Sequence, residues 1–113
     1  MIDDDAFDAL HVLAHAHRLQ GDPARAALLL NALDHLRPDA PPVLRALAAS
    51  ELAQGDPVAA MAALDRLALL GEVDAAFHLL RAQALVAQAR PAEAWLAMLA
   101  FVDQRRGVPE LTR

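Results

Sequence analysis

The stretch LQGDP (residues 19–23) recurs 34 positions later as AQGDP (residues 53–57), and an altered third copy, AQARP, occupies residues 87–91. Gly adopts the left-handed backbone conformation that ends a helix, and Asp caps the free N–H groups of the next helix. Pro fits the first turn of that helix, where no N–H donor is needed. Each copy therefore predicts the end of one helix and the start of another.

The apolar residues on both sides of these turns follow the 3.6-residue period of a helix. They recur at 34-residue spacing: Leu10, Leu13, Ala14, Ala26, Leu30 and Leu33 in the first copy, Leu44, Leu47, Ala48, Ala60, Leu64 and Leu67 in the second, and Ala82, Ala94, Met98 and Phe101 in the third. This pattern predicts a helical hairpin repeated three times. We expect helices near residues 6–19, 23–36, 41–53, 57–70, 75–88 and 91–106, the first of them capped by Asp5.

A helix-turn-helix period of 34 residues is typical of tetratricopeptide repeats (TPRs), which stack because one hairpin does not bury its apolar face alone. The sequence resembles that family over residues 7–106, with alanine at the positions where paired helices approach closely: Ala14, Ala48, Ala82, Ala26, Ala60 and Ala94. Pro38 matches the family's closing proline, whereas Glu72 and Arg106 depart from it.

The resemblance implies an all-α fold of three stacked TPR hairpins, an α-solenoid of six helices with a concave groove. We expect one domain over residues 1–113, with repeats at about 7–40, 41–74 and 75–106 and a short tail at 107–113. The third repeat lacks a capping Asp and a turn Gly, having Arg90 and Ala89 instead. Glu93 restores part of the lost stability at the helix N-terminus, but we expect the third hairpin to be the least stable.

The composition excludes several functional classes. The net charge is −5 and the ten basic residues are all Arg and scattered, so the chain lacks the footprint of a nucleic-acid-binding protein. It has an acidic start and no apolar run near the 18 residues of a membrane span, which predicts a cytoplasmic protein. There is no Cys, Lys or Tyr, and Ser50 and Thr112 carry the only hydroxyls, so we expect no catalytic site and no cofactor.

His11 and His15 lie four residues apart on one helical face, the spacing at which helices present two ligands to zinc. Val12 stands where a zinc protease motif has Glu, and His17 projects to another side. We therefore expect groove or surface histidines rather than a metal site.

Two surfaces are the candidates for function. By resemblance, the first helix of each repeat lines the concave groove, which predicts a protein-binding site at His11, His15, Arg18, Arg45, Ala49, Leu52, Leu79, Gln83 and Val86. Such a groove suits a short amphipathic or extended segment, with Arg45 available to pair with an anion. The Lys and Asn clamp with which co-chaperones of the family hold a C-terminal carboxylate is absent from these positions.

The second surface lies on the last helix. Trp95, Leu99 and Val102 form an apolar stripe there, although their equivalents in the earlier repeats are mostly polar or small. A terminal repeat usually needs a polar outer face. Either the tail covers the stripe with Val108 and Leu111, or a partner or a second copy of the chain does.

Length, repeat number and two segments, LAHAHRLQGDPARAALLLNALDHLRP (residues 13–38) and RAQALVAQARPAEA (residues 81–94), resemble the SctY (YscY) family of small type III secretion chaperones. The resemblance implies a cytoplasmic chaperone that buries an amphipathic segment of an early export substrate, SctX, in a one-to-one complex (a heterodimer) and presents it to the export gate without ATP. The alternatives are the needle-subunit co-chaperone SctG, and a general TPR interaction module that self-associates through the last helix. An enzyme is the least favoured interpretation.

Overall fold

Six helices make up the part of the chain that the computed structural model describes, residues 2–107. They are α1 (Asp4–Leu19), α2 (Pro23–Leu36), α3 (Pro41–Ala53), α4 (Pro57–Leu69), α5 (Ala75–Ala87) and α6 (Pro91–Arg106). Residues 2–107 hold no strand, so the predicted all-α class is confirmed. The helix bounds agree with the predicted ones to within one or two residues.

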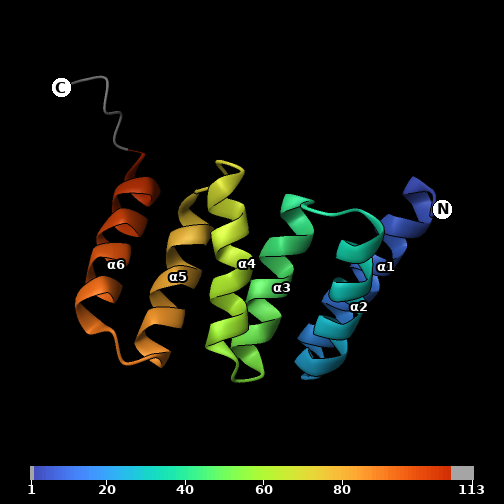
Figure 1. The fold of residues 1–113 in the computed structure, drawn as a ribbon, viewed down its shortest axis with the longest axis horizontal. Helices are drawn as coiled ribbons and strands as arrows, with labels where there is room; N and C mark the ends of the chain where they lie inside the picture. Colours follow the sequence, from blue (N-terminus) through green and yellow to red (C-terminus); the bar gives the residue numbers. More distant parts are fainter. Residues whose placement is uncertain (1, 108–113) are drawn as a thin grey trace.

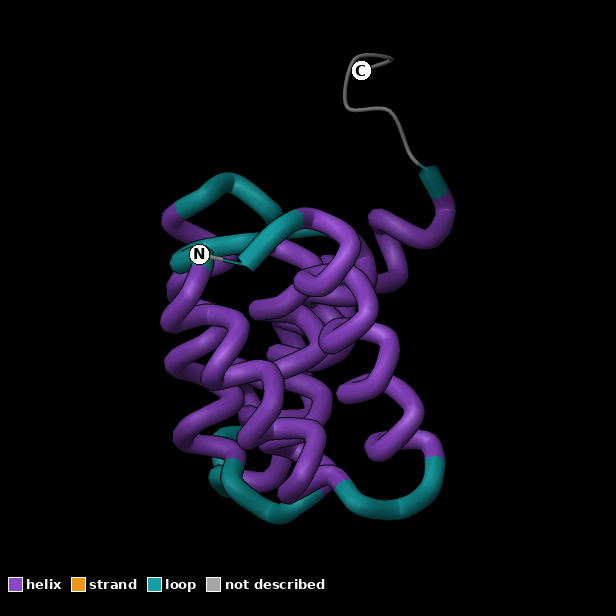
Figure 2. Tube along the Cα trace, turned by 90° about the vertical axis from the view of Figure 1, so that its right-hand side faces the viewer, coloured by secondary structure: helices purple, strands orange, loops and turns teal. Residues whose placement is uncertain are grey.

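Neighbouring helices pair as three hairpins, α1 with α2, α3 with α4 and α5 with α6, which stand in a row from the N-terminus to α6 (Figure 1). The row measures 47 × 32 × 23 Å. In a view along the row, the helices lie behind one another and the turns lie at the top and bottom of the stack (Figure 2). This arrangement is the predicted solenoid.

The two intact turns have the predicted geometry. Gly21 and Gly55 adopt φ values of 82° and 84°, in the left-handed region. The carboxylates of Asp22 and Asp56 accept hydrogen bonds from the backbone N–H groups of Arg25 and Ala59, at 3.1 and 3.0 Å. In each turn, the backbone of Gly therefore ends one helix and the side chain of Asp caps the next.

The altered third turn keeps the same backbone path with less suitable residues. Ala89 is left-handed at φ 57°, and Arg90 occupies the N-cap without a side-chain cap hydrogen bond. The guanidinium of Arg90 instead donates to the carboxylate of Glu93, at 2.6 and 2.9 Å. A two-residue defect is thus accommodated by local strain and a surface ion pair rather than by a new turn.

The start of α1 differs from the prediction, because Asp3 rather than Asp5 is the N-cap. The Asp3 carboxylate accepts a hydrogen bond from the backbone N–H of Ala6, at 2.7 Å. Arg37 fixes this end by donating to the carbonyl of Ile2 at 3.0 Å and pairing with Asp4 at 2.8 Å. Asp3, Asp4 and Asp5 are chemically equivalent as caps. Asp3 is the one that caps α1, next to the residues that Arg37 contacts.

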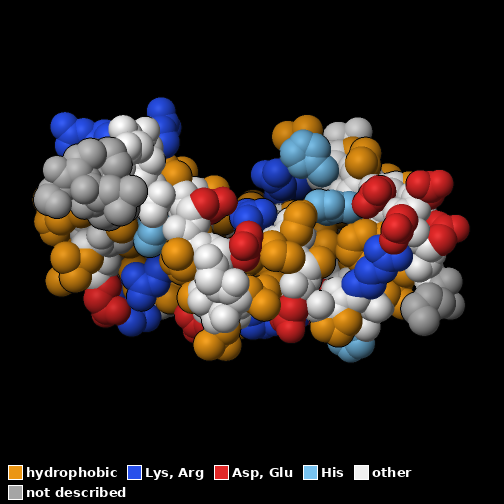
Figure 3. Space-filling model, turned by 90° about the horizontal axis from the view of Figure 1, so that it is seen from above, with side chains coloured by type: hydrophobic (Ala, Val, Ile, Leu, Met, Phe, Trp, Pro, Cys, Tyr) orange, Lys and Arg blue, Asp and Glu red, His pale blue; other side chains and the backbone are white. Residues whose placement is uncertain are grey.

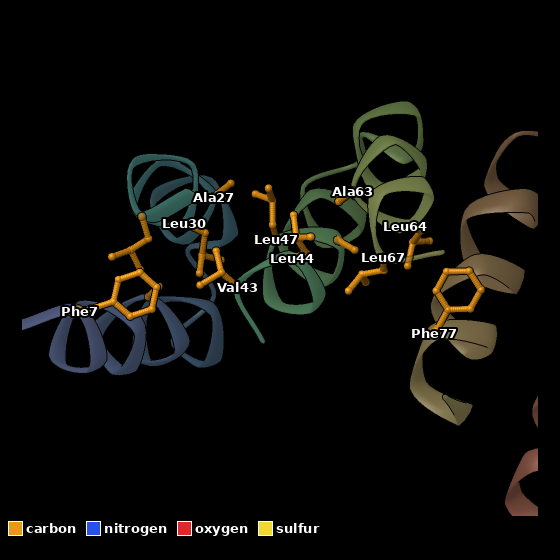
Figure 4. Packing of buried hydrophobic residues seen from close by; sticks show 13 residues of the cluster. Phe7, Ala27, Leu30, Val43, Leu44, Leu47, Ala63, Leu64, Leu67 and Phe77 are labelled. Carbon is orange, nitrogen blue, oxygen red and sulfur yellow. The ribbon is translucent and has the colours of Figure 1, made fainter. Parts of the chain in front are cut away.

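The core runs through the stack as two clusters of buried side chains. Figure 4 shows the larger cluster, in which residues of α1 to α5 pack together, from Phe7 at one end to Phe77 at the other. The smaller cluster belongs to the third hairpin and consists of Ala82, Leu85, Ala94 and Ala97. The predicted close-approach alanines are all buried. Leu13, expected to be apolar and packed, is exposed, because α1 is the end helix and no further hairpin covers it.

Candidate functional site

The first helices of the three hairpins, α1, α3 and α5, border an open hollow of about 480 Å³. Its lining consists of Arg18, Ala49, Leu52, Ala53, Leu80, Gln83 and Ala87. Figure 3 shows the outline of the molecule hollowed near its middle, with arginine and histidine side chains on one wall. The structure therefore brings four predicted groove residues together, namely Arg18, Ala49, Leu52 and Gln83.

Small residues create this hollow. Ala49, Ala53 and Ala87 leave space where larger side chains would fill it, while Leu52 and Leu80 add apolar surface. Arg18 and Gln83 supply donors, and Gln83 also supplies an acceptor. A cavity of this kind is suited to the apolar side chains of a peptide segment, with its backbone or polar side chains held at the rim.

Gln83 also lines a second, smaller hollow of about 260 Å³, together with Ala82, Val86 and Met98. This hollow lies between α5 and α6 and is bordered almost entirely by apolar side chains. Val86, another predicted groove residue, is exposed there. The concave surface thus continues from the centre of the stack toward the third hairpin.

His11, His15 and Leu79 lie on the predicted helices but do not line either hollow. Nδ1 of His15 lies 3.0 Å from Nη2 of Arg18, so the two side chains form one polar group beside the central hollow. Within residues 2–107, no group of three His, Asp or Glu side chains is arranged to hold a metal ion.

Arg45 was expected to pair with an anion of a partner, and it makes its ion pairs within the chain instead. Its Nη2 donates to the carboxylate of Glu72 at 2.8 Å, and its Nε lies 3.4 Å from Asp74 Oδ2. Both acids precede α5, so Arg45 ties the second hairpin to the third. The sequence alone did not reveal this contact because the acids lie 27 and 29 residues away.

Leu80 and Ala87 are groove residues that sequence reasoning missed. Ala87 is the 34-residue equivalent of Ala53, so the repeat itself carried that signal. Leu80 is equivalent to Ala46, and nothing in the pattern distinguishes it. Its position in the lining depends on how α5 packs against α3.

The apolar stripe on α6 is exposed in the described part of the chain. Trp95, Leu99 and Val102 are 64%, 43% and 41% exposed. Leu96, which the sequence analysis did not include, widens the stripe at 65% exposure. The proposed cover by Val108 and Leu111 lies outside the described residues.

Comparisons with known proteins bear on fold and family. No curated protein matches the sequence. Among solved structures, the chain is similar to the type III secretion translocator chaperone SycD of Yersinia enterocolitica, in an alternative dimer form. The TM-score is 0.84 at 21% identity, over 97% of this chain and 83% of that one. This likeness shows the shared fold.

None of the helices within residues 2–107 is long and apolar enough to cross a membrane. The profile of the tetratricopeptide repeat family matches residues 17–84, which is more than half of the 113-residue chain. Together with the 34-residue period, the paired helices and the concave hollow, this match shows that the chain belongs to the tetratricopeptide repeat family.

Proposed function

We propose that residues 1–113 act as one TPR unit and as a cytoplasmic type III secretion chaperone. The chain binds an early export substrate, SctX-like, in a one-to-one complex and keeps it soluble until it reaches the export gate. The concave hollow between α1, α3 and α5 carries this proposal, because its size and apolar lining suit one amphipathic segment. The similarity of fold to a translocator chaperone supports the same class of function.

The proposed mechanism is burial without chemistry. Apolar side chains of the substrate enter the space beside Ala49 and Ala53, where water would otherwise cover both surfaces. Gln83 and Arg18 bind polar groups of the segment at the rim. Binding of the folded chaperone alone shifts the substrate away from aggregation, so the proposal requires neither ATP nor a catalytic residue.

The test is co-expression with an SctX-like protein of the same secretion system, followed by size-exclusion chromatography with light scattering. We expect a one-to-one complex. Ala49→Arg fills the hollow and should weaken the complex by about tenfold or more. Ala32→Arg places the same side chain on an exposed position of α2, outside both hollows, and should leave binding unchanged. Equal binding by both variants would refute the groove as the site.

The needle-subunit alternative, an SctG-like co-chaperone, is separated by repeating the assay with the needle subunit in place of the SctX-like protein. A complex with the needle subunit alone, weakened by Ala49→Arg, would replace the first proposal with this one. Both proposals place the partner in the groove, so the same variants test both. The two proposals differ only in which protein binds.

Self-association is a second candidate function, favoured by the exposed stripe of Trp95, Leu96, Leu99 and Val102 on α6. An apolar patch of this kind on a terminal helix is typical of a contact surface. Light scattering of the protein alone should then give more than the monomer mass, and Leu99→Asp should restore the monomer. A monomer at all concentrations would remove this candidate.

A further inference from the structure

Glu51 on α3 is a buried carboxylate at a position that the repeat elsewhere fills differently. Its 34-residue equivalents are His17 in the first hairpin and Leu85 in the third. Leu85 is fully buried, and Glu51 is only 6% exposed. The second hairpin therefore carries an acid where the third carries a core leucine.

The charge of Glu51 is not neutralised within the described part of the chain. Its Oε2 accepts one hydrogen bond, from the amide of Gln54 at 3.1 Å, and no Arg or His among residues 2–107 pairs with it. Glu51 also lies in the last turn of α3, where the helix dipole is negative. Burying a carboxylate in this way costs stability unless a cation binds beside it.

Glu51 lines a pocket of about 320 Å³ that is bordered by residues of α2, α3 and α4. The other lining residues are Asn31, Leu47, Ala59, Ala62, Ala63 and Arg66. At 100° per residue, Leu47 and Glu51 face away from Ala49 and Leu52, so this pocket lies on the opposite side of α3 from the concave groove. Leu47 and the three alanines give it apolar walls, and Asn31 and Glu51 give it polar groups.

Arg66 on the rim of the pocket does not serve as the missing cation. Its guanidinium donates to Asp34 and Asp39, which hold it near the C-terminal end of α2. These ion pairs leave the surroundings of the pocket with more negative than positive charge: Glu51, Asp34 and Asp39 against Arg66. The pocket is therefore complementary to a cation with an apolar stem.

We propose that this pocket binds a lysine side chain of a partner protein. The methylene groups pack against Leu47 and the alanines, and the ammonium binds the carboxylate of Glu51, with the side-chain oxygen of Asn31 at the rim. The compact ammonium of lysine needs a single acceptor, which the carboxylate of Glu51 can offer beside its bond from Gln54. This site is independent of the proposed chaperone function.

The composition decides the source of the side chain. Residues 1–113 contain no lysine, so a second copy of these residues cannot supply one. The proposed occupant is a lysine of another protein, in contact with the face opposite the groove. The structure thus offers two separate surfaces on which different partners, or two parts of one partner, can be held.

The experiment is a titration of the isotope-labelled full chain with the peptide acetyl-Ala-Ala-Lys-Ala-Ala-amide, followed by amide chemical shifts. We expect saturating shifts at Glu51, Ala59 and Ala63 with a Kd on the order of 1 mM, and none with the same peptide acetylated on its lysine. Glu51→Gln should weaken binding by about tenfold, since it removes the charge and keeps the shape. Asp103→Asn removes an exposed charge on α6 and should change nothing.

Glu51→Leu, which installs the residue of the third repeat, separates a binding role from a structural one. If the carboxylate is kept for binding, this variant should unfold at a higher temperature and lose the lysine peptide. A lower unfolding temperature, equal shifts with the acetylated peptide, or binding that survives Glu51→Gln would each overturn the proposal.

Discussion

Both Nη atoms of Arg66 on α4 donate to the carboxylate of Asp34 on α2, at 2.6 and 2.8 Å. The same guanidinium donates to Asp39 in the loop after α2, at 2.7 and 3.0 Å. Asp34 also accepts from the backbone N–H of Asp39, at 3.1 Å, which supports the left-handed conformation of that residue. One arginine thus joins the second helices of two neighbouring hairpins and fixes the loop between them.

Asp34→Asn should lower the free energy of unfolding by about 1–2 kcal/mol, because the amide offers only one acceptor and no charge to the guanidinium. The Asp34 side chain is mostly buried, so solvent screens this pair less than a surface one. Denaturation in urea measures the change. Asp103→Asn, far from the contact, is the control, and an equal loss in both variants would contradict the assignment.

The same contact predicts how stability depends on pH. The hydrogen bond from Arg66 holds the pKa of Asp34 below its usual value, against the opposing effect of partial burial. A depressed folded-state pKa means that the contribution is complete above the unfolded pKa and is lost as the pH falls through the folded one. We expect the free energy of unfolding to fall between about pH 5 and pH 2, and to fall less steeply in Asp34→Asn. Parallel curves for the two proteins would refute the link.

The turn residues give a matched pair of substitutions of opposite sign. Ala89→Gly should stabilise the protein by about 1 kcal/mol, because Ala89 is held at φ 57°. Gly55→Ala places alanine in the same conformation in the second hairpin and should destabilise by about the same amount. No atom beyond Gly55 and its two chain neighbours lies within 4 Å of the added methyl, so backbone strain and not a collision with the rest of the fold sets the effect. Thermal unfolding of both variants checks the signs.

The third hairpin should exchange its amide hydrogens faster than the first. The cluster confined to the third hairpin consists of three alanines and one leucine, whereas the cluster that the first two hairpins share with α5 runs from Phe7 to Phe77. Less apolar area is removed from water there, and its turn carries the strained Ala89 and the uncapped Arg90. Hydrogen exchange followed by mass spectrometry measures protection helix by helix. Equal protection in α1 and α6 would show that packing compensates for the turn.

Much of the fold was predictable because its signals are local. Gly21, Asp22 and Pro23 each act within one turn of helix, and the 34-residue spacing then repeats the result. The first cap was not predictable, since three adjacent aspartates are chemically equivalent until Arg37 contacts the chain beside one of them. For the groove, the repeat predicted Ala49 and Leu52. It also predicted Arg45 as a groove residue, but the Arg45 side chain forms ion pairs with Glu72 and Asp74 of the same chain.

The sequence by itself determined the helices, their order and their pairing, because capping, backbone preference and apolar period depend on residues within a few positions of one another. Only the tertiary structure decided which charged side chains form ion pairs and which stay unpaired. Arg66 and Arg45 pair with acids 27 to 32 residues away, whereas Glu51, beside Leu47 and three alanines, has no ion pair among residues 2–107. The physical reason is that ion pairing and burial depend on distances between hairpins, which no local pattern encodes.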